Sequence, residues 1–179
     1  MIDPGAASAL LRSFHDPADG QALKSLELIG MLLDHSPAPF SRDQFTPGHI
    51  TGSGLVLSLD RVRILIVHHH RLDRWLLPGG HVEPADLSLA EAAAREVLEE
   101  TGVRVAGGHL AGADVHGIPG NGREPYHLHH DLLFHFYAES ETIQVSEESR
   151  AVAWCSPAEF DRYAIPDNVR RAWGRLTYN

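Results

Sequence analysis

Three glutamates with helical spacing are the residues in this sequence whose types and positions most directly indicate chemistry. Glu96, Glu99 and Glu100 stand at relative positions i, i+3 and i+4, so on a helix they project within reach of one common point. Like charges at this spacing repel each other, and a helix that only needs solubility more often alternates signs. Carboxylate oxygens on a rigid face suit Mg²⁺ or Mn²⁺. The alternative interpretation is a solvated acidic face that binds nothing.

The helix that would carry this triplet has clear ends in the sequence. The segment Ser88-Leu89-Ala90-Glu91 is a capping box, in which the serine and the glutamate satisfy the first free N–H groups. Gly102 suits the left-handed residue that follows a helix. We therefore expect a helix from about Leu89 to Thr101. The apolar positions expected to face the core are Ala90, Ala93, Ala94, Val97 and Leu98.

Two neighbouring features fit a site that handles phosphate. Arg95 lies four residues before Glu99, so its guanidinium can hold that carboxylate or contact a phosphate oxygen. Pro78-Gly79-Gly80 lies ahead of the helix and predicts a flexible loop. Glycine has no side chain, so the backbone of such a loop can approach a ligand closely.

The stretch from Gly80 to Val103 resembles the Nudix box. The segment Arg95-Glu96-Val97-Leu98-Glu99-Glu100-Thr101-Gly102-Val103 matches the second half of that family's pattern at every specified position. The resemblance implies a hydrolase in which water attacks a phosphorus of a diphosphate bridge in a small, nucleotide-like substrate. It further implies that Glu96, Glu99 and Glu100 bind Mg²⁺ or Mn²⁺, and that Arg95 orients this cluster.

The first half of the box departs from the family pattern by one extra residue between Gly80 and Arg95. Counted from the glycine, the first glutamate of the family falls at Asp86; counted from the arginine, it falls at Leu87. Asp86 is the expected counterpart, with Glu83 as a fallback. We therefore predict a catalytic set of Glu99, Glu100, Arg95 and Asp86.

The general base is left open by the sequence. In the family it can come from the box or from outside it. The candidates are Glu96, Glu100, Asp114, Glu124, Asp131 and Glu147.

A histidine-rich segment follows the box. On an extended strand His127, His129, Asp131 and His135 would share one face. This face is interpreted as a substrate or phosphate contact, as a solvated sheet face, or as a Zn²⁺ site. Tyr126 could stack on a base. The residues predicted to bind substrate are Gly80, His81, His116, Tyr126 and His129.

The elements around the helix predict an α/β fold, an α/β/α sandwich with a mixed sheet, and the resemblance implies that this sandwich is of the Nudix type. We expect residues 1–46 to form an N-terminal helical extension and residues 47–179 to form the Nudix domain. An apolar stripe of Ala22, Leu26, Ile29 and Leu33 would pack the extension on the main domain or on a second subunit, which leaves a homodimer open. Expected strands are Ile50–Leu59, Val62–His68, Gly108–His116, His130–Ala138 and Ala151–Trp154, with two short helices after them.

Composition narrows the class of partner. The chain has 179 residues and a formal net charge of −9, which argues against binding to a nucleic acid polymer or an anionic membrane. A small phosphorylated substrate is still compatible, because bound cations reverse the sign of a local site. The lone Cys155 allows no intrachain disulfide, and the first residues lack the order of a signal peptide. We therefore expect a cytoplasmic protein.

Two other functions compete with hydrolysis. A Nudix-like domain could bind a nucleotide or sugar nucleotide as a sensor without cleaving it. A member resembling isopentenyl-diphosphate isomerase would need a catalytic cysteine ahead of the box, whereas Cys155 follows it.

Overall fold

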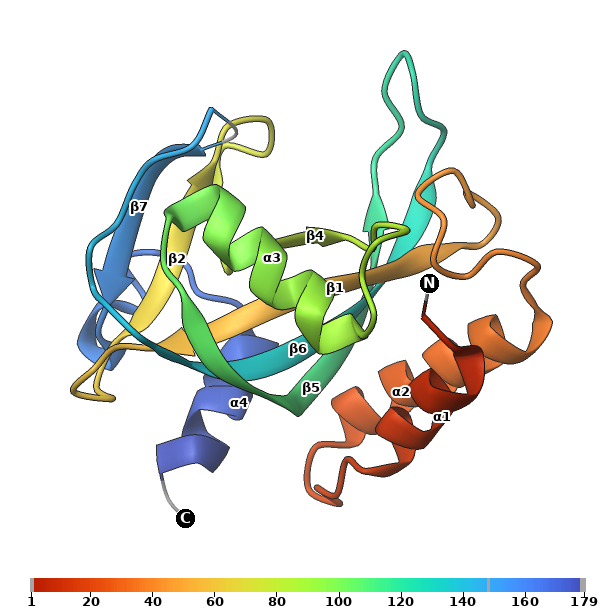
Figure 1. Cartoon of the computed structure of the whole chain (residues 1–179), viewed down its shortest axis with the longest axis horizontal. Coiled ribbons are helices and arrows are strands. Elements are labelled where there is room, and N and C mark those ends of the chain that lie inside the picture. The colour runs from red at the N-terminus through yellow and green to blue at the C-terminus, as the bar shows by residue number, and fades with distance from the viewer. Residues whose placement is uncertain (1, 148, 178–179) are drawn as a thin grey trace.

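The computed structural model describes residues 2–147 and 149–177 (Figure 1). In chain order its elements are α1 (Pro4–Arg12), α2 (Gly20–His35), β1 (Gly48–Leu57), β2 (Ile64–His69), β3 (Arg74–Leu76), β4 (Gly79–His81), α3 (Leu89–Thr101), β5 (Val105–Ile118), β6 (His127–Ala138), β7 (Ser149–Cys155), the 3₁₀ turn η1 (Pro157–Glu159) and α4 (Asp167–Thr177). No helix among the described residues is both long enough and apolar enough to cross a membrane.

The described strands form one mixed sheet with the order β3-β2-β1-β6-β5. Strands β1 and β6 run parallel over the whole of β1, and the other neighbours are antiparallel. Strand β4 pairs with β1, and β7 pairs with β2. A turn at Asp60-Arg61 connects β1 to the antiparallel β2, and Arg61 adopts a positive φ of 60° there.

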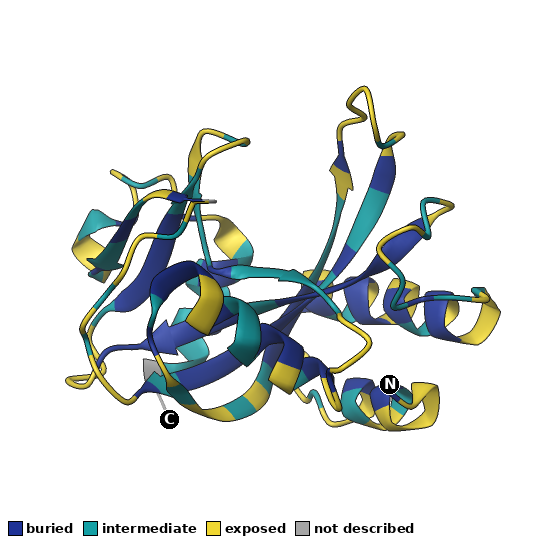
Figure 2. Ribbon diagram, turned by 45° about the horizontal axis from the view of Figure 1, so that its top comes forward, coloured by how far each residue is buried: buried dark blue, intermediate teal, exposed yellow. Residues whose placement is uncertain are grey.

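Central strands are buried on both faces, which explains their nearly continuous apolar sequence. Alternate residues of β2 face opposite sides: Leu65 and Val67 join the core under α3, whereas Ile64 and Ile66 join a second core under α4. Figure 2 shows these strands as buried and the tips of the connecting loops as exposed. The predicted α/β/α sandwich with a mixed sheet is confirmed.

Helix α3 lies unusually close to β1 because glycines face it. A Cβ atom on Gly54 would stand 2.4 Å from Cγ2 of Val97, and one on Gly52 would stand 3.3 Å from Cβ of Ala93. Any side chain at Gly54 would therefore push the helix away from the sheet. The helix begins and ends where the sequence predicted, with Ser88 accepting from the Glu91 N–H and Gly102 at a φ of 71°.

The buried face of α3 differs from the expected one. Ala93 and Val97 are fully buried as predicted, but Leu98 is 37% exposed and Glu100 only 4% exposed. The buried stripe thus includes a carboxylate, because β4 lies along that edge of the helix and the Gly79 N–H donates to Glu100 Oε2 at 3.0 Å.

The predicted flexible loop at Pro78-Gly79-Gly80 is wrong, since Gly79–His81 is strand β4. Its backbone pairs with Thr51–Ser53 of β1. A Cβ atom on Gly79 would lie 2.6 Å from Ser53 Oγ, so glycine serves here to let two strands meet closely. The two glycines therefore belong to a paired strand and not to a loop.

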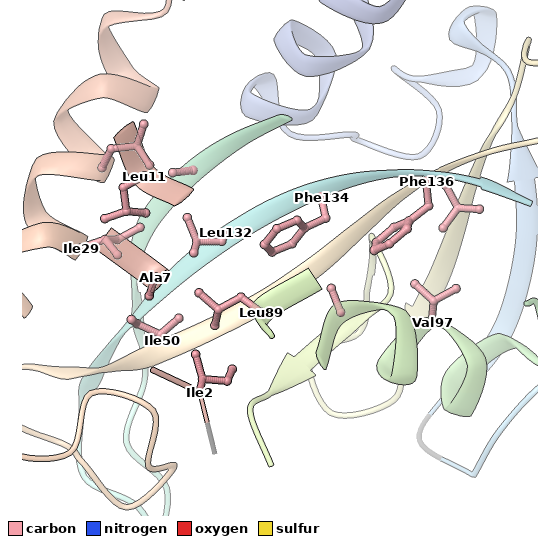
Figure 3. Packing of buried hydrophobic residues seen from close by; sticks show 14 of the residues in the cluster. Ile2, Ala7, Leu11, Ile29, Ile50, Leu89, Val97, Leu132, Phe134 and Phe136 are labelled. Carbon is pink, nitrogen blue, oxygen red and sulfur yellow. The ribbon is translucent and has the colours of Figure 1, made fainter. Parts of the chain in front are cut away.

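Helices α1 and α2 share the core with the sheet. The predicted stripe of α2 is buried, and α2 ends at His35 with Ser36 as its C-cap. Pro37 follows, which cannot continue a helix. Figure 3 shows Leu11 and Ile29 in the same buried cluster as Leu132 and Ile50. Residues 36–47 are irregular rather than helical.

The hairpin of β5 and β6 projects beyond the body of the sheet (Figure 1). Both strands are longer than predicted, Val105–Ile118 and His127–Ala138. Gly107 and Gly108 have φ angles of 105° and 113° at a register shift, so β5 accommodates an irregularity and continues pairing. The projecting arm carries His116, His127 and His129.

Asp19 links α2 to α4 through hydrogen bonds. It is 4% exposed, caps α2 by accepting from the Ala22 N–H at 3.1 Å, and accepts from Arg171 and Arg175 at 3.0 and 2.7 Å. Burial opposes ionisation, but these three donors together lower the pKa of Asp19 below its ordinary value of 3.8.

Asp19→Ala should lower the free energy of unfolding by roughly 2–3 kcal/mol, from the lost cap and charged hydrogen bonds. Because the folded pKa is depressed, this contribution is present above about pH 4 and is lost as pH falls through the folded pKa. Urea unfolding at pH 7 and pH 3 measures both effects. Asp3→Ala, which removes the exposed cap of α1, should cost only about 0.5–1 kcal/mol. Equal losses for the two variants would contradict the role of Asp19.

Candidate active site

A large open cavity lies where α3, β4, β1 and the projecting β5–β6 arm meet. Its volume is about 1580 Å³, larger than the roughly 300–1,000 Å³ usual for small-molecule sites. Residues of α3 and β4 form one part of its lining, the α3 wall, and residues of the arm form another. The cavity therefore has room for a small-molecule substrate.

Arg95 is the centre of the polar network on the α3 wall. Its Nε and Nη2 donate to the two oxygens of Asp86, each at 3.1 Å. Its Nη1 donates to Glu96 Oε1 and Glu99 Oε2, each at 2.9 Å. Its Nη2 also donates to the His81 carbonyl at 2.8 Å. All the N–H groups of the guanidinium are thus used, and this arrangement raises the pKa of Arg95 further above its ordinary value, first through the bond to Asp86.

Asp86 lies behind Arg95 and not on the cavity surface. It is 3% exposed, and Oδ2 accepts from the Glu83 N–H at 2.7 Å as well as from Arg95. Burial raises the pKa of Asp86, but the bonds from Arg95 and Glu83 outweigh burial and the net pKa is lowered. The fallback residue Glu83 lines the cavity, and its backbone supports Asp86.

The predicted triplet lines the cavity, and each carboxylate has a different environment. Glu96 packs against Gly80, where an added Cβ would lie 2.6 Å from the carboxylate carbon. The side chain of Glu99 is 57% exposed, and Glu100 is buried against Gly79. Glu96 and Glu99 accept from the same nitrogen of Arg95, which keeps those two oxygens side by side.

Sheet register places histidines in a row beside this wall. His116 pairs with His129, and His129 pairs with His49 on the next strand. The His49 and His129 rings are 5.0 Å apart, and the His81 ring lies 5.0 Å from His49. The structure thus brings the predicted residues His81, His116 and His129 together beside Gly80. Sequence reasoning missed His49, whose only signal is a histidine at the start of an apolar strand.

Two predicted residues lie outside the group. Tyr126 is 65% exposed and covers Gly117, where a Cβ would lie 2.2 Å from the tyrosine oxygen; it does not line the described cavity. His135 shares the face of β6 that carries His127 and His129, as expected, but it lies farther along the strand against Tyr137, at 4.6 Å between the rings, and does not line the cavity.

The pKa values of these histidines are shifted in different directions. Burial, followed by the neighbouring His49, lowers the pKa of His81 to about 4, and burial also lowers the pKa of His129. In contrast, the hydrogen bond with Asp114, at 2.9 Å from His116 Nδ1, raises the pKa of His116. His116 is therefore the ring best suited to carry a positive charge toward a phosphate.

All the open candidates for the general base line the cavity: Glu96, Glu100, Asp114, Glu124, Asp131 and Glu147. Asp131 differs in that burial raises its pKa, although Thr51 donates to it at 2.8 Å.

Comparisons with known proteins agree with this architecture. The NUDIX domain family matches residues 48–173. A Bacillus subtilis (strain 168) protein provisionally named 8-oxo-dGTP diphosphatase is 28% identical over 120 residues, covering 67% of this chain and 75% of that protein. The solved MutT protein of Methanosarcina mazei Go1 is 26% identical, with a TM-score of 0.53 over 71% of this chain and 91% of that chain. The NUDIX domain of Shewanella oneidensis NrtR, solved with ADP ribose, is 20% identical and shares the fold, with a TM-score of 0.57 over 82% of this chain and 96% of that chain.

The chain therefore belongs to the Nudix family. It is a hydrolase of diphosphate linkages. Cys155 is fully buried, and burial raises its pKa to about 11, so the thiol is inert rather than catalytic.

Gly80→Ala tests the contact between β4 and Glu96. The φ angle of Gly80 is accessible to alanine, but the new methyl group must displace the Glu96 carboxylate. Hydrolysis should fall by roughly 100-fold, as expected when a reacting group is misplaced by about 1 Å, with little loss of thermal stability. Gly30→Ala, where nothing lies within 4 Å of the added atom, is the control and should retain activity. Full activity of Gly80→Ala would show that the position of Glu96 does not matter.

Proposed function

We propose that this protein is an Mg²⁺- or Mn²⁺-dependent hydrolase that cleaves a diphosphate linkage in a small nucleotide-like substrate. The observation that carries the proposal is the triplet Glu96, Glu99 and Glu100 on the cavity wall beside Gly79 and Gly80. The relative provisionally named for 8-oxo-dGTP supports a nucleotide as the class of substrate.

The donor set fits a hard divalent cation. Glu96 and Glu99 present oxygens side by side, and Glu100 is held on the same wall by Gly79. Oxygen-only ligands favour Mg²⁺ or Mn²⁺ over softer metals. When bound, the cation supplies positive charge that offsets the charge of the phosphate oxygens in the transition state.

Arg95 and Asp86 act as positioning residues in this proposal. The Asp86 carboxylate holds the guanidinium through two hydrogen bonds. The guanidinium in turn holds Glu96 and Glu99. Phosphoryl transfer depends mainly on position and electrostatics. A small rotation of Arg95 would therefore displace the Glu96 and Glu99 carboxylates that it holds.

Histidines of the arm and of β4 would supply the substrate contacts. His116, whose charged form Asp114 favours, would pair with a phosphate oxygen, and neutral His81 and His129 would contact the remainder of the substrate. Gly80 leaves its backbone open to the cavity. Tyr126 would stack on a base only if the arm moved toward the cavity.

A hydrolysis screen tests the function. Purified protein with Mg²⁺ or Mn²⁺ should release products from one class among nucleoside triphosphates, ADP-ribose, NADH, dinucleoside polyphosphates and sugar nucleotides, with products identified by mass. Glu99→Gln and Glu100→Gln should each lower turnover by orders of magnitude while circular dichroism is unchanged, because each removes a ligand charge. Glu91→Gln on the same helix keeps the capping box and should stay active. Binding without turnover of any class would favour the sensor function instead.

Asp86 gives a second test. Asp86→Asn should lower kcat by roughly 10- to 100-fold and raise the Mg²⁺ concentration needed for half activation, because it loosens Arg95. Asp86→Glu restores the carboxylate and should recover a substantial part of kcat and of the Mg²⁺ activation. A purely structural role for Asp86 would not predict this recovery, because the longer side chain fits poorly in a packed site. A loss of thermal stability with unchanged Mg²⁺ activation would contradict the positioning role.

A further inference from the structure

We propose that His49, His127 and His129 form a second metal site, specific for a transition-metal cation such as Zn²⁺, at the base of the projecting arm. One ring nitrogen from each residue lies within 4.8 Å of the others, and this is the group of converging donors found among the described residues. The glutamate triplet is not such a group, so the histidines are a separate feature of the same cavity.

Strand geometry explains the convergence. His127 and His129 are two residues apart on β6 and so face the same side, and His49 lies beside His129 in the parallel register of β1 and β6. The His49 ring is 5.0 Å from both partners. Backbone hydrogen bonds of the sheet hold the site, so its three rings are preorganised on rigid elements.

The hydrogen bonds at the rear of two rings set the form required for metal binding. His49 Nδ1 lies 3.1 Å from the Gln44 carbonyl, and His127 Nδ1 lies 2.9 Å from the Pro125 carbonyl. A carbonyl only accepts, so each Nδ1 carries the hydrogen, and each neutral ring keeps a lone pair on Nε2. Histidines that bind metals characteristically donate their other N–H to a carbonyl or carboxylate in this way.

His49 supplies the independent observation that a ligand is needed. It is 1% exposed, and its Nε2 has no hydrogen-bond partner within the described chain. A buried polar atom without a partner costs free energy. His130 Nδ1 and His135 Nε2 share that condition, but neither ring belongs to the converging group. A cation at the group would satisfy the His49 nitrogen.

The chemistry of the donors selects the metal. Three neutral imidazoles suit Zn²⁺ and related transition metals and bind Mg²⁺ poorly. Burial lowers the pKa of His49 and of His129, which keeps these nitrogens available at neutral pH. His127 and His129 line the cavity, so a fourth coordination position would face the substrate. Zn²⁺ binding at this site does not depend on the proposed function. A contact between the cation and a substrate phosphate does depend on it.

Metal titration of the full chain, freed of any affinity tag and stripped with a chelator, tests the site. Isothermal titration with Zn²⁺ alone should show one tight site per chain, and Co²⁺ should give the visible spectrum of a tetrahedral site. His127→Gln and His129→Gln should each weaken Zn²⁺ binding by about 100-fold or more, since loss of a supporting partner alone costs 10- to 100-fold. Zn²⁺ should raise the Tm of the unmodified protein but not of these variants.

Two matched controls separate this site from other histidines. His130→Gln changes a buried neighbour on the opposite face of β6 and should bind Zn²⁺ like the unmodified protein. His70→Gln removes an exposed histidine of the run at residues 68–70 and should do the same. The proposal would be overturned if the unmodified protein had no tight Zn²⁺ site. It would also be overturned if His127→Gln and His129→Gln bound Zn²⁺ as tightly as the unmodified protein while His70→Gln lost Zn²⁺ binding. Glu99→Gln should retain Zn²⁺ binding, so failure of hydrolysis and failure of this site are distinguishable.

Discussion

Arg95 places a permanent positive charge among three carboxylates, and every N–H of its guanidinium is committed to a described partner. The planar fork matches Asp86 in two points and leaves its remaining donors for Glu96, Glu99 and the backbone of β4. A lysine could not reproduce this pattern, because an ammonium is a point charge without the fixed fork. The arginine therefore links α3, the loop before it and β4, and it lowers the repulsion between Glu96 and Glu99.

Strand β1 is the second constraint, because both of its faces serve the site. On one face Gly52 and Gly54 let α3 approach the sheet. This approach determines how close the glutamates of α3 lie to β4. On the other face His49 and Thr51 meet His129 and Asp131 of β6 in register. The parallel pairing of β1 with β6 thus fixes the carboxylate wall and the histidine row relative to each other.

The cavity consequently contains two donor sets of different chemical character. The α3 helix offers carboxylate oxygens around the permanent positive charge of Arg95, whereas the arm, β1 and β4 offer imidazole nitrogens. Among these histidines, His81 and His129 have lowered pKa values. His116 differs from them because Asp114 favours its charged form. This separation of hard oxygen from softer nitrogen ligands gives each wall its own preference for cations and for parts of a phosphorylated substrate.

Local sequence determined the helix that carries the chemistry, because its caps, its period and its charges all lie between Ser88 and Gly102, a span over which helix rules act directly. Ser88, Gly102 and the triplet could be placed without any tertiary information, and so could the α/β/α class. The tertiary structure decided what depends on partners distant in sequence. The burial of Glu100, the strand at Gly79–His81 and the place of Asp86 behind Arg95 each arise from contacts made by another element. The meeting of His49 with His127 and His129 depends on the register of two strands far apart in the chain, and no local pattern encodes that register, because pairing is set by the packing of whole faces against the core.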